Sequence, residues 1–220
     1  GQVILRSPSD LDNAWQALGD SPLVAEEWVP FDRELSIIAV RGQDGSMACY
    51  PLIENSHHDG ILRTSLAPAP HLSADAQSAA EQCATRVLTA LDYIGVLAIE
   101  LFDVGGRLLV NEMAPRVHNS GHLTIEGAVT SQFENHVRAI LGLPLGDTSI
   151  SRPVVMVNLI GDQPPTPDLL AIPGARLHLY GKSPRPGRKL GHVTVCAETP
   201  DQAVDRQRQI QATVAAHQTA

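Results

Sequence analysis

Residues 95–122 read GVLAIELFDVGGRLLVNEMAPRVHNSGH, and the interpretation of the whole chain starts from this stretch. Two apolar runs flank the pair Gly105-Gly106, a pattern typical of two antiparallel strands joined by a tight turn. Each run carries one glutamate among apolar neighbours, Glu100 in the first and Glu112 in the second. Burying a carboxylate without a partner is costly, so both side chains need an explanation.

The length of the turn decides whether the two glutamates meet. A two-residue turn would place Glu100 opposite Asn111 and send Glu112 to the other face of the hairpin. A three-residue loop that includes Arg107 would place Glu100 directly opposite Glu112, where like charges repel. A divalent cation would reverse that repulsion, and hard oxygen ligands suit Mg²⁺. We therefore favour a metal site at this hairpin.

The segment after the hairpin, residues 114–122, concentrates hydrogen-bonding side chains directly after a buried strand. Arg116 can bind a pair of anionic oxygens through two N–H groups. Asn119 and Ser120 could line an anion or sugar pocket. In the alternative interpretation, Glu100 forms an ion pair with an arginine such as Arg116, and the hairpin has a purely structural role.

His118 and His122 are four residues apart, the spacing at which two histidines on one helix can share a zinc ion. The neighbouring Pro115 and Gly121 favour a loop instead, and no glutamate follows the first histidine. We therefore do not expect zinc here.

The composition favours a globular protein and excludes several classes. The chain has 220 residues and a net charge of −8, which argues against a nucleic-acid surface. Its three cysteines are widely spaced, so a reducing compartment fits better than a disulfide framework. No run approaches the ~20 apolar residues that span a bilayer, and the first residues show no signal-peptide pattern. We expect a cytoplasmic α/β protein that does not bind a membrane.

The remaining pattern predicts an alternation of strands and helices. We expect strands at 2–6, 23–29, 34–40, 46–55, 61–66, 95–104, 107–114, 153–161, 175–180 and 189–197. We expect helices after Ser9, from Ser73 to near Gly95, over 131–142, within the proline-rich loop 164–173, and from Pro200 to about His217. A change in character near 145–152 divides the chain into domains at 1–148 and 149–220.

Several segments of the chain together resemble a known protein family. Glu100, followed by LLVNEMAPRVHNSGH at 108–122, resembles the ATP-grasp superfamily and, within it, the 5-(carboxyamino)imidazole ribonucleotide synthetase family. Other segments are similar in the same order: EEWVPFDRE (26–34), HHDGILRTSLAPAP (57–70) and YGKSPRPGRKLGH (180–192). The resemblance runs from about residue 2 to residue 196.

The resemblance implies an α/β (α+β) fold, with an ATP-grasp antiparallel sheet and helices followed by a small C-terminal β-rich domain. It implies a ligase of de novo purine biosynthesis that uses ATP and Mg²⁺. ATP would phosphorylate bicarbonate to carboxyphosphate, and the amino group of 5-aminoimidazole ribonucleotide would then be carboxylated, giving ADP and phosphate. Such a reaction needs positive charge on phosphate oxygens more than covalent chemistry.

The resemblance also implies roles for individual residues. Glu100 and Glu112 would hold Mg²⁺, and Arg116 and Asn119 would be catalytic, with Arg116 steadying the transferred phosphoryl group or carboxyphosphate. ATP would contact Glu26, Glu27, Trp28, Val29, Glu34, His57, Asn111 and Glu112. The ribonucleotide would contact His118, Asn119, Ser120, Lys182, Arg185, Arg188 and Lys189.

Members of the family are longer at the N-terminus, where a further α/β domain, a phosphate-binding lysine and a Gly-rich flap precede the matching region. We expect this chain to correspond to the C-terminal two-thirds of such an enzyme, to be inactive by itself, and to form a homodimer. Two alternatives stay open. The protein could be another ATP-grasp carboxylate–amine ligase, or a non-catalytic nucleotide-binding fragment.

Overall fold

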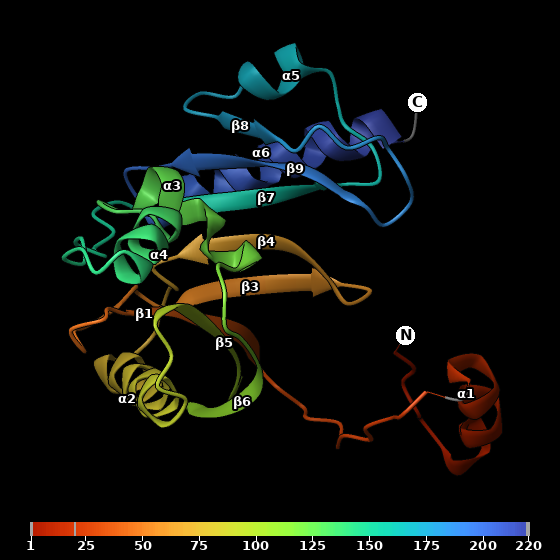
Figure 1. Ribbon diagram of the computed structural model, residues 1–220. Helices are drawn as coiled ribbons and strands as arrows, with labels where there is room; N and C mark the ends of the chain where they lie inside the picture. Colours follow the sequence, from red (N-terminus) through yellow and green to blue (C-terminus); the bar gives the residue numbers. More distant parts are fainter. Residues whose placement is uncertain (1, 20, 219–220) are drawn as a thin grey trace. The chain divides into compact units, whose positions relative to one another are not determined.

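Figure 1 shows the computed structural model of the chain, which describes residues 2–19 and 21–218. The chain divides into two compact units, residues 1–30 and 31–220, and each is described here by itself.

The first unit contains the 3₁₀-helix η1 (Pro8–Asp10) and the helix α1 (Leu11–Leu18). The predicted helix after Ser9 is therefore confirmed. The strands predicted at 2–6 and 23–29 are wrong, because neither segment is assigned to a strand. An apolar run becomes a strand only when its backbone groups find a neighbouring strand, and neither run pairs with one among the described residues.

The second unit is built on one antiparallel sheet, to which nine strands of the described residues belong. The sheet runs in the order β6–β5–β1–β3–β4–β7–β9–β8, and the short β2 pairs with β1 (Figure 1). The strands are β1 (Arg33–Arg41), β2 (Met47–Cys49), β3 (Ile53–His58), β4 (Ile61–Ala67), β5 (Gly95–Val104), β6 (Arg107–Ala114), β7 (Val154–Ile160), β8 (Arg176–Leu179) and β9 (Lys189–Cys196).

Helices cover both faces of this sheet. One face carries α2 (Ala74–Ala90) and α6 (Pro200–Gln218), and the other carries η2 (Asn119–Leu123), α3 (Thr124–Gly127) and α4 (Gln132–Ile140). A short helix, α5 (Thr166–Leu170), lies between β7 and β8 in the chain. Because strand residues alternate between faces, Ile37 packs with the α2 side, whereas Ile38 packs with Leu123 and Ala139 on the other side.

Most of the predicted elements are confirmed in this unit. The two strands of the β5–β6 hairpin have the predicted bounds, and Ser73 caps α2 by accepting a hydrogen bond from the Ala76 backbone N–H. The strand predicted at 46–55 is split into β2 and β3, since Pro51 cannot donate to a ladder. The helix predicted to continue to Gly95 ends at Ala90.

The sheet continues through the predicted domain boundary, because β4 pairs with β7 in a register that sets Ser65 opposite Met156. The division at 148 and 149 stays a prediction. Among the described residues, no helix is both long and apolar enough to cross a membrane. Cys49, Cys83 and Cys196 are free and partly buried.

Candidate functional site

The β5–β6 hairpin places Glu100 opposite Glu112 on the neighbouring strand. Its turn has two residues, because Val104 pairs directly with Arg107. A β-bulge next to Glu100 then shifts the register and leaves Asn111 unpaired in the ladder. The two-residue turn is therefore right, but its predicted consequence is wrong, since the bulge brings Glu112 back to Glu100.

Three potential ligand atoms gather at this hairpin. An oxygen of Glu100, an oxygen of Glu112 and a ring nitrogen of His118 all lie within 4.8 Å of one another. Burial raises the pKa of Glu100, the charge on His57 opposes that rise, and the charge of Glu112 adds to it. A divalent cation would relieve the repulsion between the two carboxylates, and carboxylate oxygens are what Mg²⁺ prefers. The donor set therefore fits Mg²⁺.

A second glutamate–histidine pair lies on the same face of the sheet. Oε2 of Glu34 lies 3.0 Å from Nδ1 of His57 and also accepts a hydrogen bond from the His57 backbone N–H. Burial lowers the pKa of His57, but the hydrogen bond and charge of Glu34, together with Glu100 and Glu112, outweigh it and raise the pKa overall. A carboxylate beside a histidine that is inclined to be protonated offers both an acceptor and a donor to a ligand.

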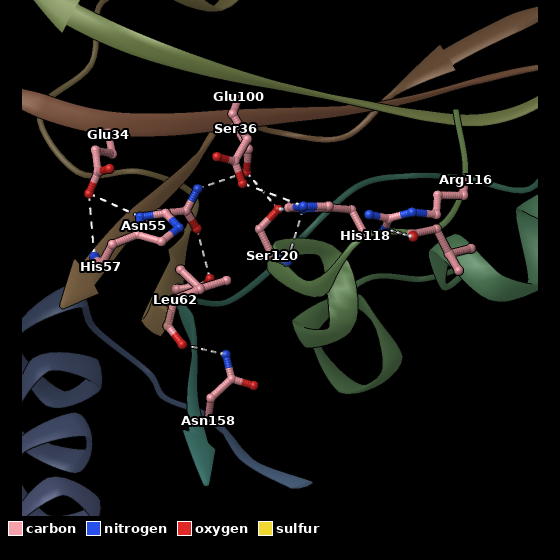
Figure 2. A network of polar contacts seen from close by, with 12 residues as sticks. Glu34, Ser36, Asn55, His57, Leu62, Glu100, Arg116, His118, Ser120 and Asn158 are labelled. Carbon is pink, nitrogen blue, oxygen red and sulfur yellow. Dashed lines mark hydrogen bonds and ion pairs between the residues drawn. The ribbon is translucent and has the colours of Figure 1, made fainter. Parts of the chain in front are cut away.

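Figure 2 shows the side chains of His118 and Ser120 extending from the start of η2 toward the sheet. His118 Nε2 lies 3.4 Å from Glu100 Oε1, so Glu100 pairs with His118 rather than with Arg116 as in the alternative interpretation. The Ser120 hydroxyl is fully buried and contacts both Ser36 Oγ and His118 Nδ1. The Ser120 hydroxyl thus has partners inside the protein, and its contact with a substrate stays a prediction.

Basic side chains lie near His118, since the charges of Arg116 and Lys189 add to burial in lowering its pKa to about 4. Arg116 is exposed and donates to the backbone oxygen of Val117. The Nζ atoms of Lys182 and Lys189 lie 5.5 and 5.9 Å from the centroid of the Tyr180 ring. Burial, followed by the charges of Lys182 and Arg116, lowers the pKa of Lys189 to about 8. The structure thus brings three predicted anion-binding residues within electrostatic reach of one another.

The other predicted residues of the second unit are less closely grouped. Asn119 is half-buried, and its Oδ1 has no hydrogen-bond partner among the described residues. Arg188 donates to the backbone oxygen of Ser183, and the exposed Arg185 lines a shallow surface hollow beside Asp162.

The predicted adenine-contacting residues belong to the first unit. Glu26, Glu27 and Trp28 are exposed and Val29 is half-buried, in a segment without regular secondary structure. Their placement relative to Glu34 is not part of what the structure describes.

A partly buried histidine cluster, formed by His122, His178 and His192, was not predicted from the sequence. The rings of His178 and His192 stack at 4.5 Å between centroids, and that of His122 lies 5.5 Å from His192. Burial lowers the pKa of His122 to about 4 and of His192 to about 3, and nearby positive side chains add to this effect. One signal was available, because His178 and His192 lie in two apolar runs predicted as strands, but their register could not be foreseen.

Gln132 connects this cluster to His118. Its side chain accepts from the His118 backbone N–H and donates to both the His118 backbone oxygen and His122 Nδ1. A Cβ at Gly121 would lie 2.5 Å from Gln132 Oε1, so this packing requires glycine there. Within the described part of the chain, His122 does not belong to the potential metal-binding group that contains His118.

Comparisons with known proteins agree with this geometry. Residues 1–133 match the model of the ATP-grasp domain, and residues 154–206 match the phosphoribosylaminoimidazole carboxylase C-terminal domain. The chain is 50% identical over 199 residues to the N5-carboxyaminoimidazole ribonucleotide synthase of Pseudomonas aeruginosa, covering 90% of this chain and 54% of that protein.

Solved structures show the same likeness. The structure of N5-carboxyaminoimidazole ribonucleotide synthetase from Thermus thermophilus superimposes with a TM-score of 0.93 at 54% identity, covering 97% of this chain and 59% of that one. The synthase of Aspergillus clavatus, solved in complex with ADP and 5-aminoimidazole ribonucleotide, gives 0.89 at 38% identity, covering 94% and 58%. The resemblance to the synthetase family and the antiparallel ATP-grasp fold are confirmed.

The chain spans about half the length of the curated relatives that it matches, 54% in the examples from Vibrio parahaemolyticus and Pseudomonas aeruginosa. The ATP-grasp model nevertheless covers more than half of these 220 residues, from 1 to 133. By fold, by the opposed carboxylates of its hairpin and by this match, the chain belongs to the ATP-grasp family.

Proposed function

We propose that the protein carrying this chain uses ATP and bicarbonate to carboxylate 5-aminoimidazole ribonucleotide to its carboxyamino form in purine biosynthesis. The reaction passes through carboxyphosphate and releases ADP and phosphate. The observation that carries the proposal is that Glu100 lies opposite Glu112, with Arg116 and Lys189 nearby. The chain that holds them is 50% identical over 199 residues to an N5-carboxyaminoimidazole ribonucleotide synthase.

In this proposal Glu100 and Glu112 hold Mg²⁺, which supplies positive charge to phosphate oxygens when bound. Asn111 lies beside them because the bulge leaves it out of the ladder. Arg116 steadies the transferred phosphoryl group or carboxyphosphate, since its guanidinium matches an anionic oxygen pair. Its exposure supports this role, because the guanidinium is free to meet a ligand.

The nucleotide is held by the second glutamate–histidine pair. Glu34 accepts the ribose hydroxyls, and His57 lies beside the phosphates, where its raised pKa favours the charged form. The segment of Glu26, Glu27, Trp28 and Val29 supplies backbone groups to adenine, which suits its lack of regular pairing.

The ribonucleotide is held by the loop after the hairpin and by the basic segment. Asn119 faces the imidazole, and its unpaired buried Oδ1 suits the donated proton of an amino group. His118 and Ser120 also line the proposed ribonucleotide site. Its 5′-phosphate is bound by Lys182, Arg185, Arg188 and Lys189. We further propose cytoplasmic location, two domains at 1–148 and 149–220, and a homodimer.

The test follows ADP release by the protein that carries these residues, with ATP, Mg²⁺ and bicarbonate, with and without 5-aminoimidazole ribonucleotide. We expect release that depends on the ribonucleotide and matches formation of its carboxylated product. Glu112→Gln should abolish it, and Glu198→Gln, an exposed glutamate paired with Arg152, should leave it unchanged. ATP binding without a response to the ribonucleotide would point to another ATP-grasp ligase. ATP binding without any turnover would point to a nucleotide-binding module.

A further inference from the structure

A row of polar side chains crosses the sheet on the face that η2 covers. Ser65 on β4, Asn55 on β3 and Ser36 on β1 follow one another across three strands, because Ser65 pairs with Asn55, and Asn55 pairs with the residue two before Ser36. The next strand continues the row, since Ser36 lies opposite Glu100. All three polar side chains are at most 6% exposed, on the face that also buries Ile38, Ile53 and Met156.

Every hydroxyl and amide of this row is connected to the next (Figure 2). Ser65 Oγ donates to Asn55 Oδ1 at 2.8 Å, and Asn55 Nδ2 donates to Ser36 Oγ at 3.0 Å. Ser36 Oγ donates to Ser120 Oγ at 2.8 Å, which lies 2.9 Å from Nδ1 of His118. Buried polar groups are costly unless paired, so this row serves to fix geometry rather than to fill the core.

The chain of hydrogen bonds has one direction. The Ser120 backbone N–H donates to His118 Nδ1, so that nitrogen carries no proton. Because a bare Nδ1 can only accept, the Ser120 hydroxyl donates its own proton to it while accepting from Ser36 Oγ. The remaining ring proton of His118 sits on Nε2, the nitrogen that lies 3.4 Å from Glu100 Oε1.

We infer that this polar row fixes His118 as the Nε2–H tautomer and that His118 is thereby a positioning residue, whose Nε2–H holds Glu100 in place opposite Glu112. The inference rests on the proposed function in so far as Glu100 is a metal ligand. A protonated Nε2 cannot itself bind a cation, so His118 belongs to the support of the site and not to its ligands. The sheet from β4 to β5 thus anchors one carboxylate.

The tautomer can be measured without any metal or nucleotide. A protonated and an unprotonated imidazole nitrogen differ strongly in ¹⁵N chemical shift, so NMR of the histidine-labelled 220-residue chain at pH 7 assigns the proton. We expect His118 to show a protonated Nε2 and a bare Nδ1. A protonated Nδ1 would overturn the inference, whatever the chain binds.

The positioning role is tested with Mn²⁺ as the probe, alone and with ADP, by electron paramagnetic resonance. His118→Gln places an amide nitrogen near the position of Nε2, whereas His118→Asn reaches only as far as Nδ1. Because loss of an outer partner typically weakens metal binding about 10- to 100-fold, we expect that loss in His118→Asn and a change below about threefold in His118→Gln. Equal affinities in the two variants would contradict a positioning role.

The row itself is tested at Ser36, which touches no ligand atom. Ser36→Ala should weaken Mn²⁺ binding about threefold or more and broaden or shift the His118 nitrogen signals. Thr194→Val is the matched control, because Thr194 is also fully buried in the sheet but its hydroxyl has no hydrogen-bond partner among the described residues. Unchanged Mn²⁺ binding in Ser36→Ala would contradict the inference.

Failure of the proposed function would look different. If Glu112→Gln bound Mn²⁺ as well as the unmodified chain, the metal assignment would be wrong, while the NMR result would still decide the tautomer. If Glu112→Gln lost Mn²⁺ but both His118 variants kept it, the metal assignment would stand and the positioning role would be wrong.

Discussion

The pKa of His57 and the pKa values of His122 and His192 are shifted in opposite directions. In the acidic cluster of Glu34, Glu100 and Glu112, the pKa of His57 is raised despite burial, because the carboxylates outweigh the loss of solvent. In the histidine cluster of His122, His178 and His192, burial lowers the pKa of His122 and His192, and Lys189 adds to the effect. The pKa of a histidine is therefore shifted upward at His57 and downward at His122 and His192. His118, although it lies beside Glu100, follows the second pattern, because burial and then the charge of Arg116 lower its pKa to about 4.

The difference shows that one sheet carries two electrostatic environments, an acidic cluster and a largely uncharged histidine cluster. Carboxylates without enough compensating charge are suited to a divalent cation. When burial keeps His122 and His192 neutral, they add no positive charge beside Lys182, Lys189 and Arg116, the cations that we propose to meet an anion. The contrast in pKa should be visible in the pH dependence of stability as well as in binding.

The largest expected effect is a loss of stability in acid from the histidine cluster. The folded-state pKa values of His122 and His192, about 4 and about 3, lie below the ordinary value, so the unfolded chain takes up protons first as the pH falls. Stability is complete above about pH 6.5 and falls below it, by about 2 kcal/mol for each histidine between pH 6.5 and 5. Urea unfolding at pH 7 and pH 5 measures the loss.

A matched pair of variants assigns this loss. His122→Asn keeps an acceptor for Gln132 but cannot titrate, so the loss between pH 7 and pH 5 should shrink by about 2 kcal/mol. His58→Asn removes an exposed histidine and should leave it unchanged. An equal loss in all three proteins would mean that His122 is not held neutral.

The next effect comes from Gln132→Glu, which introduces an acidic group into the histidine cluster. The variant loses both N–H donors to the His118 backbone oxygen and His122 Nδ1, and buries a charge against acceptors. We expect about 3 kcal/mol of destabilisation and a raised pKa of His122, measurable by urea unfolding and NMR titration. Gln82→Glu on the exposed side of α2 is the control. Unchanged stability would show that Gln132 does not join the two regions.

The strands of the chain could be predicted from the sequence where the local apolar pattern coincides with actual pairing to a neighbouring strand. The strands 95–104 and 107–114 have the predicted bounds because two apolar runs flank a Gly-Gly turn. The runs at 2–6 and 23–29 look alike in sequence but form no strand, since a strand also needs a neighbour that local pattern does not reveal. Local sequence therefore predicts the tendency to form a strand, but not which strand it will pair with.

The site could be predicted in its residue types but not in its register. Glu100 and Glu112 were identified as a pair, yet their meeting depends on a bulge at Asn111 that nothing in the sequence marks. Ser36 and Asn55 were not identified, because a serine or asparagine in a strand gives no sign of the chain of hydrogen bonds it will enter. Such contacts link residues far apart in the chain and emerge only from the sheet.

A smaller effect is expected from Glu34→Gln in the acidic cluster. Without the Glu34 charge, burial should lower the pKa of His57 from its raised value. A raised folded-state pKa stabilises the protein fully below the unfolded value and loses that contribution as pH rises through the folded value. The variant should therefore lose about 1 kcal/mol at pH 6 and less at pH 9, by urea unfolding. Equal losses at both pH values would contradict an ion pair.

The smallest effect is expected from Tyr180→Phe in the histidine cluster. The hydroxyl lies 2.6 Å from His192 Nδ1, and burial raises the pKa of Tyr180 to about 12, so this contact is a hydrogen bond between neutral groups. Such a bond contributes about 1 kcal/mol or less, and phenylalanine keeps the ring beside both lysines. The loss of stability should be the same at pH 7 and pH 8. In Glu34→Gln, by contrast, the loss should differ between pH 6 and pH 9. A loss that grows as the pH falls from 8 to 7 would mean that His192 is charged in the folded protein, and the contrast between the two clusters would be wrong.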